Sequence, residues 1–137
     1  MKAISKIKVT KWEEKNFGDN PEMHKFTEAS VVFDVQGDLE GQANVEYLMY
    51  YNSFDAKEPL KSSANYVGLI HFVGKINGKN GSLVFEDRGI FEGGAAKSEL
   101  KIILGSGTAE LVGVHGFGKY TASHTESVFE IDYGFET

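Results

Sequence analysis

Strict alternation of apolar and polar residues is the feature that most limits how this chain can fold. In the segment EASVVFDVQ, one face of an extended chain carries Ala29, Val31, Phe33 and Val35. The other face is polar and carries Glu28, Ser30, Asp34 and Gln36. Because successive side chains of a β-strand point to opposite sides, this pattern indicates strands with one face toward water. Helical spacing is sustained nowhere, so we expect an all-β protein with little helix.

Glycine-bearing turns divide the chain into about eight predicted strands. The segments QGDLEG, INGKNG and EGGAAK are typical hairpin turns, and both prolines fall in longer polar connections. The predicted strands lie near residues 3–12, 24–36, 42–52, 65–77, 82–92, 97–104, 108–115 and 123–136. Consecutive antiparallel strands in 137 residues predict a single domain, residues 1–137. Closure into a β-barrel would remove the exposed sheet edges.

Two predicted strands are apolar on both faces. In ANVEYLMYY and NYVGLIHFVGKI, apolar residues occupy both sets of alternating positions. A strand of this kind has something covering its outer side, which is either a second subunit or the loop at residues 53–64. We predict a homo-oligomer whose interface buries Met49, Ile70 or Phe72.

Charge and composition exclude several classes of partner and site. The net charge is −6 at pH 7 and the basic residues are scattered singly, which argues against nucleic acid and anionic membranes. The chain has no cysteine, so it has no disulfide or thiolate nucleophile. Its N-terminal segment alternates lysine with apolar residues, unlike a signal peptide. No apolar run reaches the ~20 residues of a membrane helix. We expect a cytoplasmic protein of bacterial type.

The glycine-rich segment GSGTAELVGVHGFGKY, residues 105–120, could be read as a nucleotide-binding loop. A dinucleotide-binding turn needs Gly-x-Gly-x-x-Gly before a helix. Here Glu110 stands where the third glycine belongs, and we expect a strand to follow rather than a helix. We therefore interpret the first two glycines as a turn between strands, and the later three as strand kinks or close backbone approaches.

Several segments resemble, in order and spacing, domain-of-unknown-function family 3224. They are VTKWEEK, GDLEGQANVEYLMYY, YVGLIHFVGKINGKNGSLVFEDRGIFEGG, GSGTAELVGVHGFGKY and IDYGFE. The resemblance covers nearly the whole chain. It implies an allene-oxide-cyclase-like, calycin-like barrel, which agrees with the strand count. It implies no activity, because the family has none established and fold does not determine function.

The histidines do not predict a metal site. None of the usual ligand spacings joins the four, which are His24, His71, His115 and His124. A turn in GFGKYTAS, centred near Lys119 and Tyr120, would allow His115 and His124 to face each other. Two imidazoles alone make a poor metal site. We expect no metal and no other cofactor.

Two glutamates are candidate catalytic residues. Glu46 lies among large apolar residues in VEYLMYY, and Glu110 lies in TAELVG. If either points into the barrel, it can serve as a general acid or base. The alternative is an outward side chain in water or in a subunit interface, and buried glutamates are uncommon.

Three functions remain open. The first is binding of a small apolar or amphipathic molecule inside the barrel, with Glu46 as a polar anchor. The aromatic walls of that site would be Tyr47, Tyr50, Tyr66, Phe72 and Tyr133. The second is an isomerase or cyclase acting on such a ligand, with Glu46 or Glu110 as the acid or base. The third is a structural homo-oligomer with a filled barrel.

Overall fold

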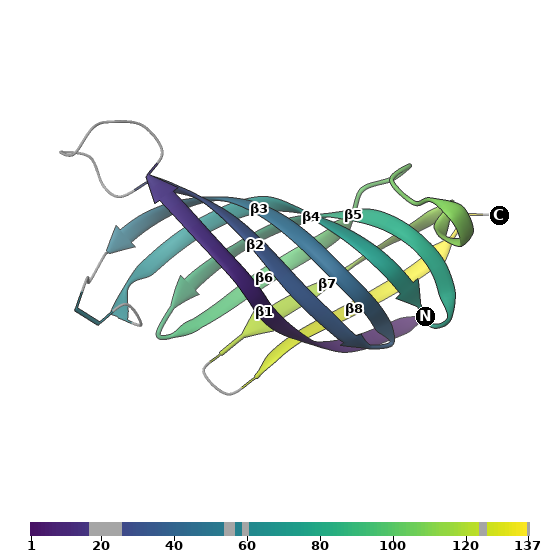
Figure 1. Ribbon diagram of the computed structural model, residues 1–137, viewed down its shortest axis with the longest axis horizontal. Helices are drawn as coiled ribbons and strands as arrows, with labels where there is room; N and C mark the ends of the chain where they lie inside the picture. Colours follow the sequence, from purple (N-terminus) through teal and green to yellow (C-terminus); the bar gives the residue numbers. More distant parts are fainter. Residues whose placement is uncertain (17–25, 54–56, 59–60, 124–125, 137) are drawn as a thin grey trace.

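Eight antiparallel strands form one closed barrel in the computed structural model (Figure 1). The structure describes residues 1–16, 26–53, 57–58, 61–123 and 126–136. The strands are β1 (Lys2–Asn16), β2 (Phe26–Gly37), β3 (Leu39–Ser53), β4 (Ser63–Ile76), β5 (Lys79–Glu92), β6 (Ala95–Ile102), β7 (Val114–Ala122) and β8 (Ser127–Phe135). Each strand pairs with the next one, and β8 pairs with β1. The predicted all-β barrel is therefore confirmed.

The strand predicted at residues 108–115 is wrong. Residues Ala109–Leu111 form a short 3-10 helix, η2, and β7 begins only at Val114. The segment is held beside β5, where the Thr108 amide donates to the Ser82 carbonyl and the Ser82 amide donates to the Thr108 hydroxyl. These bonds fix an irregular backbone that side-chain alternation does not report. The expected turn before it is confirmed, since Gly105 has a φ of +84°.

The predicted turn at GFGKYTAS is also wrong, because β7 runs through it. Lys119 pairs with Glu130, and Tyr120 pairs with Phe129 of β8. The glycines of this segment do not end the strand. A Cβ on Gly118 would lie 2.1 Å from the Glu130 carbonyl oxygen, so glycine there permits a close approach of β8. His115 pairs with Gly134, and His124 lies outside the described residues.

The interface predicted through Met49, Ile70 or Phe72 is wrong for these residues. All three point into the barrel and are buried in its core. The second apolar face of β3 and β4 is the outer one, where Leu48, Val67 and Leu69 are exposed. Alternation alone could not tell which of two apolar faces is the inner one. A homo-oligomer stays a prediction, and sedimentation at micromolar concentration tests it.

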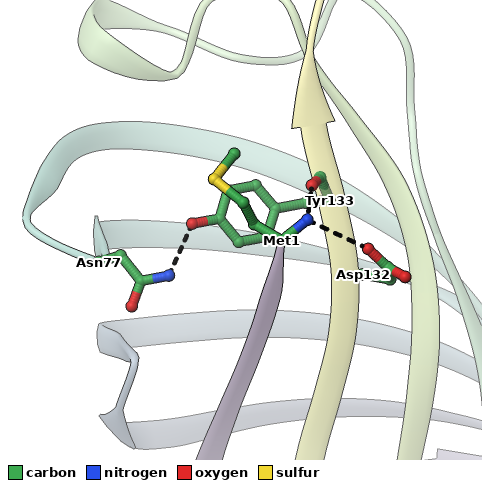
Figure 2. A network of polar contacts seen from close by, with 4 residues as sticks. All are labelled: Met1, Asn77, Asp132 and Tyr133. Carbon is green, nitrogen blue, oxygen red and sulfur yellow. Dashed lines mark hydrogen bonds and ion pairs between the residues drawn. The ribbon is translucent and has the colours of Figure 1, made fainter.

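Large side chains fill most of the barrel. The biggest fully buried ones are Phe33, Phe72, Phe85, Phe129, Leu39, Ile70, Ile76 and Leu83. Both chain termini and η2 lie at one end of the barrel (Figure 1). The buried side chain of Leu111 closes this end by packing against Gly81, whose position faces the interior. Figure 2 shows polar contacts at this closed end. There the Asn77 amide donates to the Tyr133 hydroxyl at 2.6 Å, and the Met1 amino group donates to the Tyr133 carbonyl.

A β-bulge in β1 decides which of its side chains point into the barrel at the end opposite η2, called the open end below. The pairing of β1 with β2 shifts by one residue between Val9 and Lys11. Before the shift, odd-numbered side chains face inward. After it, Trp12 pairs with Val31 and Glu14 pairs with an inward alanine, so even-numbered side chains face inward.

Among the described residues, no helix is long and apolar enough to cross a membrane.

Candidate functional site

A row of three inward positions joins β3, β4 and β5. Tyr47 pairs with Gly68, and Gly68 pairs with Asp87. A Cβ on Gly68 would lie 2.6 Å from Cδ1 of Tyr47, so the tyrosine ring occupies the space that the glycine leaves. The ring therefore crosses one strand, and its hydroxyl donates a 2.7 Å hydrogen bond to Oδ2 of Asp87. The bond depends on glycine at the middle position.

A second row repeats this arrangement on β4, β5 and β6. Tyr66 pairs with Gly89, and Gly89 pairs with Ser98. A Cβ on Gly89 would lie 2.5 Å from the Tyr66 hydroxyl, so a side chain there would displace it. The hydroxyls of Tyr66 and Ser98 share a hydrogen bond of 2.5 Å. The two tyrosine rings meet edge to face, with centroids 5.1 Å apart.

Asp87 is the one charged side chain among the buried residues that the structure describes. It is 0% exposed, and its Oδ1 accepts no hydrogen bond within that part of the chain. Burial raises the pKa of the Asp87 carboxyl, and the hydroxyls of Tyr47 and Ser98 partly offset this increase. A buried carboxyl oxygen without a donor is uncommon in native proteins and calls for an explanation.

A cavity of about 60 Å³ lies at the open end, in front of these two rows. Its lining consists of Trp12, Phe33, Tyr47, Met49, Tyr66, Phe91, Ala96 and Tyr120. Phe33 and Tyr120 form its floor and pack on Phe129, with ring centroids 6.1 and 5.2 Å from it. Burial is the main cause that raises the pKa of Tyr47, Tyr66 and Tyr120, so these phenols are neutral at physiological pH.

Glu14 organises the rim of this cavity. Its carboxylate accepts hydrogen bonds from the Trp12 indole at 3.0 Å, the Thr27 hydroxyl at 2.7 Å and the Tyr51 hydroxyl at 2.8 Å. Burial and the bond to Glu14 together raise the pKa of Tyr51. Trp12 is 47% exposed, so Glu14 holds an indole that both lines the cavity and reaches solvent.

A larger hollow of about 850 Å³ lies on the outer surface of β5–β8. Its lining combines acidic and basic side chains with the exposed apolar side chains of Phe117 and Leu104. No buried polar group is aimed at this groove among the residues that the structure describes. We place the candidate site at the smaller cavity, because it is lined by the rings of Tyr47 and Tyr66, whose hydroxyls bond to the buried Asp87 and Ser98.

The structure brings two of the sequence-predicted wall residues together. Tyr47 and Tyr66 line the cavity. Phe72 is fully buried in the core and does not line it, and Tyr133 lies at the closed end, bonded to Asn77. Tyr50 points outward, where its ring meets Phe26 with centroids 6.3 Å apart.

The two candidate glutamates lie apart from the cavity and from each other. Glu46 is on the outer face of β3, and its two carboxylate oxygens accept from the Ser30 hydroxyl at 2.9 and 2.7 Å. Glu110 lies on η2 at the closed end, where it accepts from the Asn80 amide at 3.1 Å. Neither side chain is buried. In the described part of the chain, no group of three or more His, Asp or Glu is placed to hold a metal.

Sequence reasoning missed the buried polar residues. One signal was present: Asp87 shares strand parity with Leu83 and Phe85, which makes it a carboxylate on an apolar face. Trp12 and Glu14 gave no signal of this kind, because the bulge reverses the parity of β1 before them.

Comparison with known proteins gives a family. A family model described as a protein of unknown function, DUF3224, matches residues 3–135. The chain belongs to this family. It is similar to a DUF3224 protein of unknown function from Shewanella oneidensis MR-1, whose crystal structure superposes with a TM-score of 0.80 at 25% identity. That match covers 100% of this chain and 98% of the other. No curated protein matches. The likeness to allene oxide cyclases stays a prediction.

Proposed function

We propose that this DUF3224 barrel binds a small apolar or amphipathic molecule in the cavity at its Trp12 end. The observation that carries the proposal is the lining: six aromatic side chains leave a small space at the end of an otherwise filled barrel. Ligand sites in proteins are lined mostly by hydrophobic and aromatic side chains, and this cavity has that composition.

The volume restricts the ligand. About 60 Å³ accommodates a group of only a few heavy atoms. A larger ligand needs Trp12 to move, and the exposed position of its indole allows that movement. Among the described residues, phenylalanine and aliphatic side chains occupy the deeper interior. The ligand, or the part of it that enters the barrel, is therefore small.

The chain supplies its own reporter, since Trp12 is the one tryptophan and lines the cavity. Titration of a panel of small soluble molecules should shift or quench its fluorescence saturably. Ala96→Leu fills the cavity and should abolish the response. Ala95→Leu makes the same change at the next, outward position of β6 and should preserve it. Equal responses of both variants, or none from the wild type, would refute the cavity as a binding site.

An isomerase or cyclase is the second candidate, and it rests on Asp87. Its raised pKa brings a buried carboxyl closer to the range in which it can hold and release a proton near neutral pH. Asp87 does not line the cavity, so a proton passing between it and a bound molecule goes through the Tyr47 hydroxyl. Turnover of a cavity ligand by the wild type, lost in Asp87→Asn with binding retained, distinguishes this candidate from a binding protein.

A further inference from the structure

We propose that the cavity takes the unsubstituted hydrocarbon end of an amphipathic molecule and leaves the polar group of that molecule outside the barrel. This inference rests on the proposed binding function and specifies which end of the ligand the protein recognises. It starts from the composition of the cavity wall and from the position of its opening.

The cavity wall offers a ligand almost no polar partner. Its surface is nearly all apolar, and no charged side chain contributes to it within the described residues. The hydroxyl of Tyr47 is bonded to Asp87 and that of Tyr66 to Ser98, and neither Asp87 nor Ser98 lines the cavity. A polar atom of a ligand that enters this space loses its bonds to water without replacement, which is costly.

A hydrocarbon group fills the same space without that cost. Each CH₂ group removed from water strengthens binding about fourfold. Water competes weakly for the cavity, because a water molecule needs several polar partners to be held inside a protein. The flexible side chain of Met49 is part of the wall and can adapt to the shape of an alkyl group. The wall therefore favours the end of a ligand that carries no polar atom.

The opening of the cavity sets the orientation of the ligand. Among the residues of the lining, Trp12 is exposed, and Phe91 and Ala96 are half-buried. The other members of the lining are all buried. The three accessible residues therefore mark the mouth, and a polar group beyond them keeps its contacts with water. The molecule enters with its hydrocarbon end first.

Pentan-1-ol and pentane-1,5-diol test the inference, because they share one carbon skeleton. The alcohol can enter by its methyl end and keep its hydroxyl in water, whereas the diol buries a hydroxyl whichever end enters. Both are titrated into the full chain at pH 7 while Trp12 fluorescence and chemical shifts are followed. We expect the alcohol to bind about tenfold or more tightly than the diol, because the buried hydroxyl finds no partner.

The head group provides a second comparison. Pentylammonium, pentan-1-ol and hexanoate carry a positive, a neutral and a negative head group on the same pentyl chain. We expect their affinities to lie within about fivefold of one another at physiological salt, because the head group stays in water and exposed charges are screened there. A larger spread would show that the protein reads the head group and would overturn the inference.

Two alanines of β6 offer matched variants. Ala96→Ser places a hydroxyl on the cavity wall with little change in volume, so the preference for the alcohol over the diol should fall about threefold or more. Ala95→Ser makes the same change at the next, outward position and should leave the preference intact. Ala96→Leu should abolish binding of every probe, which places the binding in the cavity. Equal preferences in the two serine variants would contradict the role given to the cavity wall.

The outcomes separate this inference from the proposed function. A diol that binds as tightly as the alcohol overturns the inference and leaves the cavity as a binding site, since a polar group such as the Tyr120 hydroxyl would then have to meet it. Binding of none of these probes overturns the inference, and a null result for the wider panel as well overturns the proposed function.

Discussion

The hydroxyl of Tyr47 on β3 reaches the carboxyl of Asp87 on β5 by crossing Gly68 on the strand between them. The crossing explains how a closed barrel keeps a carboxyl on its inner wall. The tyrosine satisfies one carboxyl oxygen and at the same time shields the group from water, which accounts for both the hydrogen bond and the raised pKa of Asp87.

Removal of that hydroxyl should destabilise the barrel. Tyr47→Phe keeps the ring but removes the hydroxyl that donates to Oδ2 of Asp87. A buried oxygen then loses its donor, so we expect a loss of about 1–3 kcal/mol in the free energy of unfolding. Tyr120→Phe is the matched control. It changes another ring of the same cavity, and its hydroxyl makes no hydrogen bond with the described residues. Urea unfolding of both variants measures the difference. A Tyr120→Phe loss as large as that of Tyr47→Phe would contradict the assigned role.

The buried carboxyl predicts a pH dependence of stability. Burial raises the pKa of Asp87 above its ordinary value of 3.8, so the folded state holds this proton more tightly than the unfolded state does. The contribution of Asp87 to stability is therefore complete below about pH 4 and is lost as the pH rises through the folded-state pKa, at about 1.4 kcal/mol per unit of separation.

Asp87→Asn removes this dependence. The free energy of unfolding of the variant minus that of the wild type should increase from pH 4 toward neutral pH. Thermal or urea unfolding across this range measures it. Glu86→Gln, an exposed carboxylate on the same strand, should show no comparable trend. A difference that stays constant with pH for Asp87→Asn would mean that burial does not perturb this carboxyl.

Glycine at position 68 should be indispensable for the crossing. A Cβ there would lie 2.3 Å from the Glu46 carbonyl oxygen and 2.6 Å from the Tyr47 ring, so both backbone and ring would have to move. We expect Gly68→Ala to cost about 1–3 kcal/mol or more, as overpacking does. Gly134→Ala is the control, because its Cβ would meet only the His115 ring, at 3.1 Å. Comparable losses for both would refute the steric explanation.

The architecture could be predicted from the sequence because its cause is local. One inner and one outer face per strand impose a period of two, and glycine turns mark the hairpins, so an eight-strand barrel follows from patterning alone. The same reasoning failed at residues 108–115. Hydrogen bonds to Ser82 on β5 hold the backbone there, and those bonds come from residues distant in the sequence.

The site was harder to predict, because it depends on parity and on register. The sequence left open whether Glu46 points inward, because both its neighbours are large and apolar; the pairing places Tyr47 inside and Glu46 outside. Asp87 could have been noticed on the apolar face of β5. Its partner could not have been identified, because only the register of three strands places Tyr47 opposite Asp87, with Gly68 between them.

Glu46→Gln tests whether any function belongs to the outer face. The Glu46 carboxylate is exposed and bonded to the Ser30 hydroxyl, a contact that an amide can retain in part. We therefore expect a change of less than about 0.5 kcal/mol in stability, as for most surface substitutions. Binding of the small-molecule panel should be unchanged, because Glu46 does not line the Trp12 cavity. Parallel titration of Glu46→Gln and Ala96→Leu decides between the outer face and the cavity. Weakened binding in Glu46→Gln together with unchanged binding in Ala96→Leu would move the site from the barrel interior to the outer surface of β2 and β3.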